Sequence, residues 1–210
     1  MHLAARLAAR ARQHGLVIPE PVAGALVAYF ELLQRWNRKI NLTSLSDPDE
    51  ALDRLILEPV AAAEHLPSHG RLADLGSGGG SPAIPLALVL GASKLLMVES
   101  RSRKAAFLRE AAREVHLPAI VEAGRFEDVS RQAAYAHHFD LVSVRAVRPD
   151  AAALGASADL VRPGGLVALF GGPGSGAPPS LPEDLTWRGT WPLLPSSGSQ
   201  LTLVFHVEHR

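Results

Sequence analysis

The stretch Leu72–Pro85, L-A-D-L-G-S-G-G-G-S-P-A-I-P, predicts a strand, a tight loop and a helix in succession. An apolar run ends at Asp74, four of the five positions 76–80 are glycine, and Pro82 opens an apolar segment of helical length. Glycine allows positive φ angles and close approach of a ligand to the backbone, because it has no Cβ. The start of a helix adds free N–H groups and the positive end of the helix dipole. The stretch therefore predicts a loop that holds a nucleotide-like ligand.

Strands and helices are expected to alternate after this loop. We expect strands at Leu72–Leu75, Lys94–Glu99, Ala119–Glu122, Phe139–Val144 and Gly165–Phe170, and helices at Pro82–Leu90, Ser102–Val115 and Pro149–Val161. Repeated strand–helix units of this size predict an α/β fold with a mostly parallel, Rossmann-like sheet and helices on both faces. Two further strands, around Thr186–Trp191 and Leu201–Val207, have no helical pattern between them and should form a terminal antiparallel ribbon.

The N-terminal third shows helical patterns only. A helix rich in alanine, leucine and arginine should run from His2 to His14 and end at the glycine that follows. A second helix starts near Pro21, and a third begins at Asp47, a typical N-cap residue with a proline after it. We therefore expect an N-terminal helical layer in residues 1–66 and the α/β domain in residues 67–210.

Composition limits the class of protein. The chain has 210 residues, of which 47% are hydrophobic, and it contains no cysteine, which excludes disulfides and thiolate metal sites. Neither the apolar core of a secretory signal nor an apolar segment of ~20 residues for a membrane span is present. We expect a soluble, cytoplasmic protein without a membrane partner. No metal site is expected, since His206 and His209 lie three apart on a predicted strand and should point to opposite faces.

The formal net charge is zero, which argues mildly against a protein dedicated to nucleic-acid binding. The charges are unevenly distributed, because residues 101–113 carry five basic residues and one acidic residue. A run of this kind is typical of a solvated helix face, and an RNA surface is the alternative.

A pair of carboxylates favours one cofactor over another. Glu99 lies 19 residues past Gly80, at the end of the second predicted strand, where a carboxylate can accept hydrogen bonds from both ribose hydroxyls. Asp74 lies two residues before the first glycine. A carboxylate there would repel the pyrophosphate of a dinucleotide, but it suits the cationic amine of S-adenosylmethionine. A capping role for Asp74, and a glycine turn without any ligand, are the structural alternatives.

Four motifs resemble the RsmG (GidB) family, whose members methylate guanine N7 in bacterial 16S rRNA. They are Trp36-Asn37-x-x-Ile40-Asn41-Leu42-Thr43 with Asp47-Pro48 after it, Asp74-x-Gly76-Ser77-Gly78-x-Gly80-x-Pro82-x-Ile84-Pro85-Leu86, Arg103-Lys104-x-x-Phe107-Leu108, and Phe139-Asp140-x-Val142-x-x-Arg145-Ala146. The similarity extends over most of residues 25–170. It implies the S-adenosylmethionine-dependent methyltransferase fold, with an N-terminal helical extension.

The resemblance also implies roles for single residues. Glu99 and Ser100 would hold the ribose, Phe126 and Glu127 would lie along the adenine, and Arg145 would stand at the mouth shared by cofactor and substrate. The candidate cofactor-binding residues are therefore Asp74, Gly76, Gly78, Ser81, Glu99, Ser100, Phe126, Glu127 and Arg145.

The chain departs from the family pattern at four places. Relatives usually carry a histidine and an aspartate where Leu55 to Pro59 reads L-I-L-E-P, and a lysine-glycine pair where Phe170 is followed by Gly171. A basic residue often stands where this chain has Ser199-Gln200, and leucine is usual at Ser81. The first three differences concern positions expected near RNA. The resemblance is therefore stronger at the cofactor-binding positions than at the RNA-binding positions.

The function implied is transfer of a methyl group to N7 of a guanine in 16S rRNA (position 527 in standard rRNA numbering). The partner would be 16S rRNA or the assembling small ribosomal subunit, and we expect a monomer. Guanine N7 has a free lone pair, so we expect no acid–base residue; catalysis would come from alignment, with Arg145 positioning the substrate. Arg101, Arg103, Lys104 and the N-terminal arginines are candidates for holding the RNA backbone. The alternatives are a methyltransferase of the same fold with another substrate, and a non-catalytic ribosome-associated module.

Overall fold

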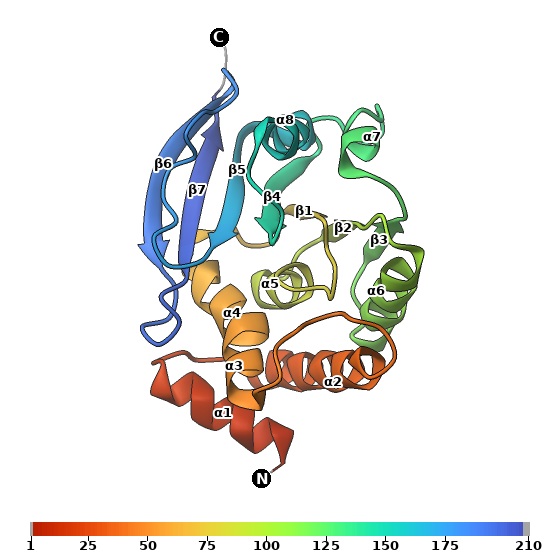
Figure 1. The fold of residues 1–210 in the computed structure, drawn as a ribbon, viewed down its shortest axis with the longest axis vertical. Coiled ribbons are helices and arrows are strands. Elements are labelled where there is room, and N and C mark those ends of the chain that lie inside the picture. Colours follow the sequence, from red (N-terminus) through yellow and green to blue (C-terminus); the bar gives the residue numbers. More distant parts are fainter. Residues whose placement is uncertain (1, 208–210) are drawn as a thin grey trace.

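A seven-stranded sheet organises the protein, seen in a computed structural model that describes residues 2–207 (Figure 1). The strands lie in the order β3-β2-β1-β4-β5-β7-β6. Their bounds are β1 Arg71–Leu75, β2 Lys94–Val98, β3 Ala119–Glu122, β4 Phe139–Arg145, β5 Val161–Gly171, β6 Leu185–Pro192 and β7 Gln200–His206. The first five strands run parallel, whereas β7 is antiparallel to both β5 and β6. The predicted parallel sheet with a terminal antiparallel ribbon is confirmed.

Helices cover both faces of this sheet. They are α1 Leu3–Gln13, α2 Glu20–Asn37, α3 Pro48–Leu52, α4 Glu58–Ala62, α5 Ala83–Leu90, α6 Ser102–Glu114, α7 Phe126–Ser130 and α8 Ala151–Leu160, with a π-helical turn at Asp53–Leu57 and a 3-10 turn at Ala63–His65. Helices α1 to α6 lie on one side of the sheet, and α7 and α8 lie on the other (Figure 1). Helices α5 and α6 contact the strands, whereas α1 and α2 form an outer layer on the helices. The short helix α7 and the π-helical turn are not predicted from the sequence.

Alternation along the strands separates two hydrophobic cores. Leu72 of β1 belongs to the core under α2, α4, α5 and α6, whereas its neighbour Ala73 belongs to the core under α8. Successive side chains of a strand point to opposite faces, so an apolar run supplies both cores at once. This explains why the strands read as continuous apolar runs in the sequence.

The N-terminal helices pack on the same core as α5 and α6. The expected N-cap is confirmed, because the Asp47 side chain accepts hydrogen bonds from the backbone N–H groups of Asp49 and Glu50. Two arginines of α1 pair within this layer: Arg6 with Asp49, and Arg10 with Asp53. Because these two side chains are engaged in holding α1, they are poor candidates for the RNA contacts expected of them. The division at residue 66 stays a prediction.

Helix ends lie within two residues of the expected positions; for example, α8 begins at Ala151 and not at Pro149, because Asp150 is its N-cap. Pro82 is the N-cap residue of α5 and lies just outside the helix, which begins at Ala83. Among residues 2–207, no helix is both long and apolar enough to cross a bilayer. The expectation about a metal site concerns His206 and His209, and His209 lies outside the described residues.

Candidate functional site

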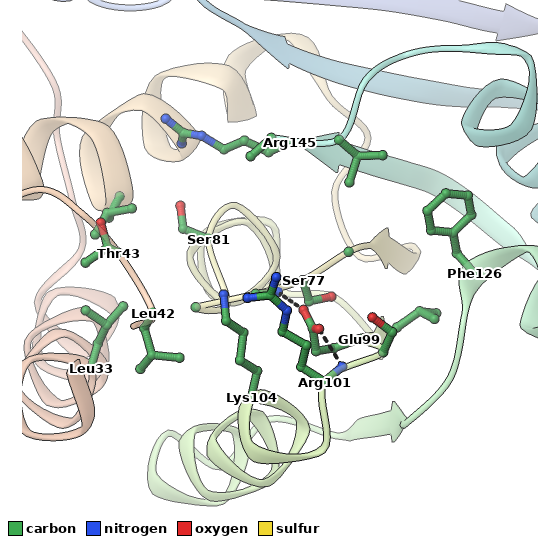
Figure 2. Close-up of a pocket in the computed structure, with 18 of the residues that line it drawn as sticks. Leu33, Leu42, Thr43, Ser77, Ser81, Glu99, Arg101, Lys104, Phe126 and Arg145 are labelled. Atoms are coloured by element: carbon green, nitrogen blue, oxygen red, sulfur yellow. Dashed lines mark hydrogen bonds between the residues drawn. The ribbon is translucent and has the colours of Figure 1, made fainter. Parts of the chain in front are cut away.

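A cavity of about 660 Å³ opens where β1, β2 and β4 end (Figure 2). The carboxyl ends of parallel strands are the usual ligand-binding edge of such a sheet, because the connecting loops meet there. The wall of the cavity has two parts, a floor and a roof. The cavity floor is the glycine loop, residues 76–80, together with Glu99. The cavity roof is the segment 42–45, Arg54 and Leu55 of the π-helical turn, and Arg145.

The floor depends on glycine at specific positions. Gly76, Gly78 and Gly80 have backbone φ angles of 72°, 52° and 86°, which residues with a Cβ rarely adopt. A Cβ on Gly76 would lie 2.6 Å from Cγ2 of Val147, and one on Gly80 would lie 2.8 Å from Cδ1 of Ile84. The predicted reason for the glycines is therefore confirmed at the level of backbone geometry, and the loop leaves its backbone open to the cavity.

Glu99 ties the glycine loop to the end of β2 (Figure 2). Its Oε2 accepts a hydrogen bond from the backbone N–H of Gly78 at 2.9 Å, and its Oε1 accepts one from Arg101 N–H at 2.8 Å. The residue is only 7% exposed, yet it lines the cavity. Each carboxylate oxygen has a further lone pair, so Glu99 can accept hydroxyl hydrogen bonds from a ligand while it holds the loop.

Asp74 lies in a different place from the one that the sequence predicts. Its carboxylate does not line the cavity; it is 1% exposed beneath the loop and accepts a hydrogen bond from Ser143 Oγ at 2.5 Å. Burial raises the pKa of Asp74 to about 6, although hydrogen bonds from Ser143 and Ser77 act in the opposite direction. Asp74 in this structure therefore supports the floor from below, and a direct cofactor contact remains a prediction.

The roof is anchored by residues of the Trp-Asn motif and of α2. Oδ1 of Asn37 accepts hydrogen bonds from the backbone N–H groups of Leu42 and Thr43, at 2.8 and 3.0 Å. The Tyr29 hydroxyl, fully buried, donates to the carbonyl of Gly79 at 2.6 Å. The segment after α2 is thus folded onto the cavity, and α2 is fastened to the glycine loop.

Arg145 is the last residue of β4 and closes the roof from the other side. Its Nη2 lies 2.6 Å from Oε2 of Glu58, and its Nη1 donates to the carbonyl of Arg54 at 2.6 Å. Glu58 is 1% exposed, and Arg145 also lies over the ring of Phe170 at 5.9 Å. Burial lowers the pKa of Arg145, while the Glu58 carboxylate acts to raise it. Arg145 therefore forms a buried ion pair with Glu58 and also lines the cavity.

A basic groove continues outward from the cavity. It is lined by Lys39, Arg101, Arg103 and Lys104, with Ile40, Asn41, Ser100 and Ser102, and it shares Ser100, Arg101 and Lys104 with the cavity. In the described part of the chain these four cations form no ion pair with a carboxylate. The groove is therefore a strip of unneutralised positive charge at the mouth of the cavity.

The structure brings together eight of the nine predicted site residues. Gly76, Gly78, Ser81, Glu99, Ser100, Phe126, Glu127 and Arg145 all line the cavity, and only Asp74 does not. The sequence does not predict the roof residues Leu42 to Leu45 or Leu33. The Trp-Asn motif identifies the segment that contains Leu42 and Thr43. It does not show that this segment folds onto the glycine loop. Of the departures from the family pattern, Leu55 lines the cavity and Glu58 holds Arg145.

Comparison with known proteins agrees with this geometry. The family described as rRNA small subunit methyltransferase G matches residues 23–175. The ribosomal RNA small subunit methyltransferase G of Xanthomonas axonopodis pv. citri is 40% identical over 151 residues, which are 71% of this chain and 69% of that protein. The protein of the same name from Stenotrophomonas maltophilia (strain R551-3) is 38% identical over 152 residues, 72% and 69% of the two chains.

Solved structures resemble the fold at low sequence identity. An O-methyltransferase candidate from Klebsiella pneumoniae superimposes with a TM-score of 0.64 at 15% identity, over 99% of this chain and all of that one. A mutant of MtNAS in complex with S-adenosylmethionine gives a TM-score of 0.60 at 14% identity, over 89% and 79% of the two chains. The likeness shows the Rossmann-like fold of S-adenosylmethionine-dependent methyltransferases.

Proposed function

The chain belongs to the rRNA small subunit methyltransferase G family, and on this premise we propose that it methylates N7 of a guanine in 16S rRNA with S-adenosylmethionine. The observation that carries the proposal is the cavity floor, where three glycines with positive φ meet a carboxylate at the ends of two adjacent strands. The alternatives, another substrate or a non-catalytic module, are not favoured by membership of this family.

The floor fits the cofactor in shape and in chemistry. A Cβ at Gly76 would clash with Val147 and one at Gly80 with Ile84, so the loop keeps this shape only with glycine. Glu99 would accept hydrogen bonds from the ribose hydroxyls, Ser100 would lie beside it, and Phe126 and Glu127 would flank the adenine, since all four line the cavity. We propose that Gly76, Gly78 and Arg145 complete the cofactor-binding site. Asp74 would act from below the loop.

Catalysis is proposed to depend on alignment. S-adenosylmethionine would supply an electrophilic methyl carbon on its sulfonium and would leave as the neutral thioether S-adenosylhomocysteine. Guanine N7 already carries a free lone pair at neutral pH, so the protein needs no general base. Its residues have to hold the base at the correct distance and angle and to exclude water, an effect of several kcal/mol, up to about 7–11 in model reactions. Roof residues 42–45 and Arg145 are placed to do this, and we propose Arg145 as a positioning residue.

The RNA backbone is proposed to lie in the basic groove. Its four cations have no carboxylate partner in the described chain, and the groove leads directly into the cavity. A base that is splayed out of a single-stranded or loop region could then enter while its phosphates stay on Lys39, Arg103 and their neighbours. We also propose that the protein works in the cytoplasm as a monomer, since ribosomal RNA is assembled there and each chain contains a complete cavity.

Methyl transfer to isolated substrates tests this function. The purified protein is mixed with tritiated S-adenosylmethionine and with 16S rRNA or small subunits from a strain that lacks the gene, and modified bases are mapped by mass spectrometry. We expect up to one 7-methylguanosine per RNA, and the comparison of naked RNA with subunits identifies the true substrate. Absence of incorporation into both would contradict the proposal.

The groove has a matched pair of variants on one helix. Arg103→Glu, at the start of α6, should raise the KM for RNA several-fold and reduce the slope of log affinity against log salt by about 0.7 for each lost phosphate contact. Arg113→Glu makes the same charge change in the last turn of α6, outside the groove, and should leave both quantities nearly unchanged. Equal effects of the two variants would show that the groove has no special role.

A further inference from the structure

One buried hydroxyl group in the cavity wall has no partner. Oγ of Ser81 is buried and makes no hydrogen bond in the structure. In the described residues the hydroxyl of Ser199 is also buried and unpaired, but it does not line the cavity. A buried polar group that lacks a partner costs free energy, and a ligand that bonds to it recovers this cost. Ser81 therefore marks a point where a ligand is expected to form a hydrogen bond.

The position of Ser81 indicates which ligand this is. Figure 2 shows Ser81 and Thr43 on one side of the cavity and Glu99 and Phe126 on the other. In the proposed function Glu99 and Phe126 hold the nucleoside part of the cofactor. Ser81 therefore borders the space left for the incoming RNA base, below the roof.

The chemistry of the guanine edge matches a hydroxyl donor. N7 and O6 lie next to each other on this edge, and both are hydrogen-bond acceptors. If N7 has to stay free to receive the methyl group, O6 is the atom by which the protein can hold the edge. Arg145 uses one N–H of each Nη on the Arg54 carbonyl and on Glu58, and these two bonds hold its guanidinium in the roof. Ser81 has an O–H that is not used by the protein.

We propose that the Ser81 hydroxyl donates a hydrogen bond to O6 of the guanine whose N7 is methylated. The inference rests on the proposed function, and it adds a residue that contacts the substrate base beside the reacting atom. The bond orients the base in its plane, so that the N7 lone pair points into the cavity towards the floor.

The test compares two bases and two side chains. The 16S rRNA is ligated from synthetic and transcribed fragments, with guanosine or 2-aminopurine riboside at the target position, and is assembled into subunits if naked RNA is not accepted. 2-Aminopurine keeps N7 but lacks O6. With guanosine, Ser81→Ala should lower kcat/KM by about three- to tenfold, the effect of one lost neutral hydrogen bond. With 2-aminopurine the variant and the wild type should be equally slow.

Two controls keep the outcomes apart. Ser81→Thr retains a hydroxyl and should keep most of the activity. The Kd for S-adenosylhomocysteine, measured by calorimetry, should be the same for Ser81→Ala and wild type. A weaker Kd, or an equal loss on both bases, would overturn the proposal and assign the hydroxyl to the cofactor; unchanged kcat/KM would overturn it as well. Wild-type protein that methylates no RNA would instead contradict the proposed function.

Discussion

The floor of the cavity and its roof are each held by hydrogen bonds, and the partners of these bonds lie at different separations along the sequence. In the floor, Glu99 reaches back 21 positions to Gly78 and forward two to Arg101, and both partners are backbone N–H groups. In the roof, Arg145 contacts Arg54 and Glu58, which are 91 and 87 positions away, through a buried ion pair. The Glu99 contacts of the floor therefore lie within neighbouring elements of the sheet, with Tyr29 of α2 as a more distant partner of Gly79, whereas the Arg145 side of the roof forms only when the N-terminal helices and the sheet have come together. Variants of the two parts should consequently fail in different ways.

The largest effect is expected in the roof. Arg145→Ala leaves the Glu58 carboxylate buried without its partner, and breaking such a pair costs about 3–5 kcal/mol. Chemical denaturation should show this loss. Turnover, assayed at a temperature where the variant is folded, should fall at least tenfold, while the Kd for S-adenosylhomocysteine changes less.

The double variant Arg145→Ala/Glu58→Gln serves as the control, because it removes the unpaired charge and should regain part of the stability. A single variant as stable as the wild type, or one with unchanged turnover, would show that the roof does not depend on this pair.

A smaller effect is expected in the floor, where a variant should weaken cofactor binding and change the stability little. Glu99→Gln removes the negative charge and replaces one carboxylate oxygen by an amide N–H₂ group, which cannot accept a hydrogen bond from a ribose hydroxyl. Loss of this proposed hydrogen bond to a charged group costs about 1.5–3 kcal/mol, which corresponds to roughly a ten- to hundredfold weaker Kd for S-adenosylmethionine. Calorimetry measures the affinity, and thermal unfolding of the ligand-free protein should change little in comparison with Arg145→Ala. Unaltered affinity would refute the assignment of Glu99 to the cofactor.

The smallest effect concerns Asp74, beneath the floor, and depends on pH. Its pKa is raised to about 6 in the folded protein, so the folded state binds this proton more tightly than the unfolded chain. The contribution to stability is present below pH ~4 and is lost as the pH rises through about 6. Asp74→Asn, which keeps an acceptor for Ser143, should therefore stabilise the protein at pH 8 and have nearly no effect on its stability at pH 4.

Denaturation curves of both proteins across this pH range give the comparison. If Asp74→Asn is instead less stable at pH 8, the ionised carboxylate is needed by the floor. If it loses much of its affinity for S-adenosylmethionine, the direct contact predicted from the sequence gains support.

The separation of contacting residues along the sequence also explains how much of the structure could be predicted. Strand–helix alternation, the glycine loop and Glu99 are local patterns, and the sheet and eight of the nine candidate residues follow from them or from the family motifs. The pairing of Arg145 with Glu58 joins distant segments, and nothing in either neighbourhood shows it. Asp74 lies at the right point of the chain, but its burial under Ser143 is set by the register of β1 with β4. The five-residue helix α7 is too short to have a recognisable period.

The central claim, that this cavity methylates a guanine of 16S rRNA, is tested most directly in the cell. The gene is deleted, and the 7-methylguanosine content of 16S rRNA is mapped by mass spectrometry before and after complementation. We predict that one 7-methylguanosine disappears, that the wild-type gene restores it, and that the Glu99→Gln variant restores it poorly. A deletion strain whose 16S rRNA keeps all of its 7-methylguanosine would contradict the account.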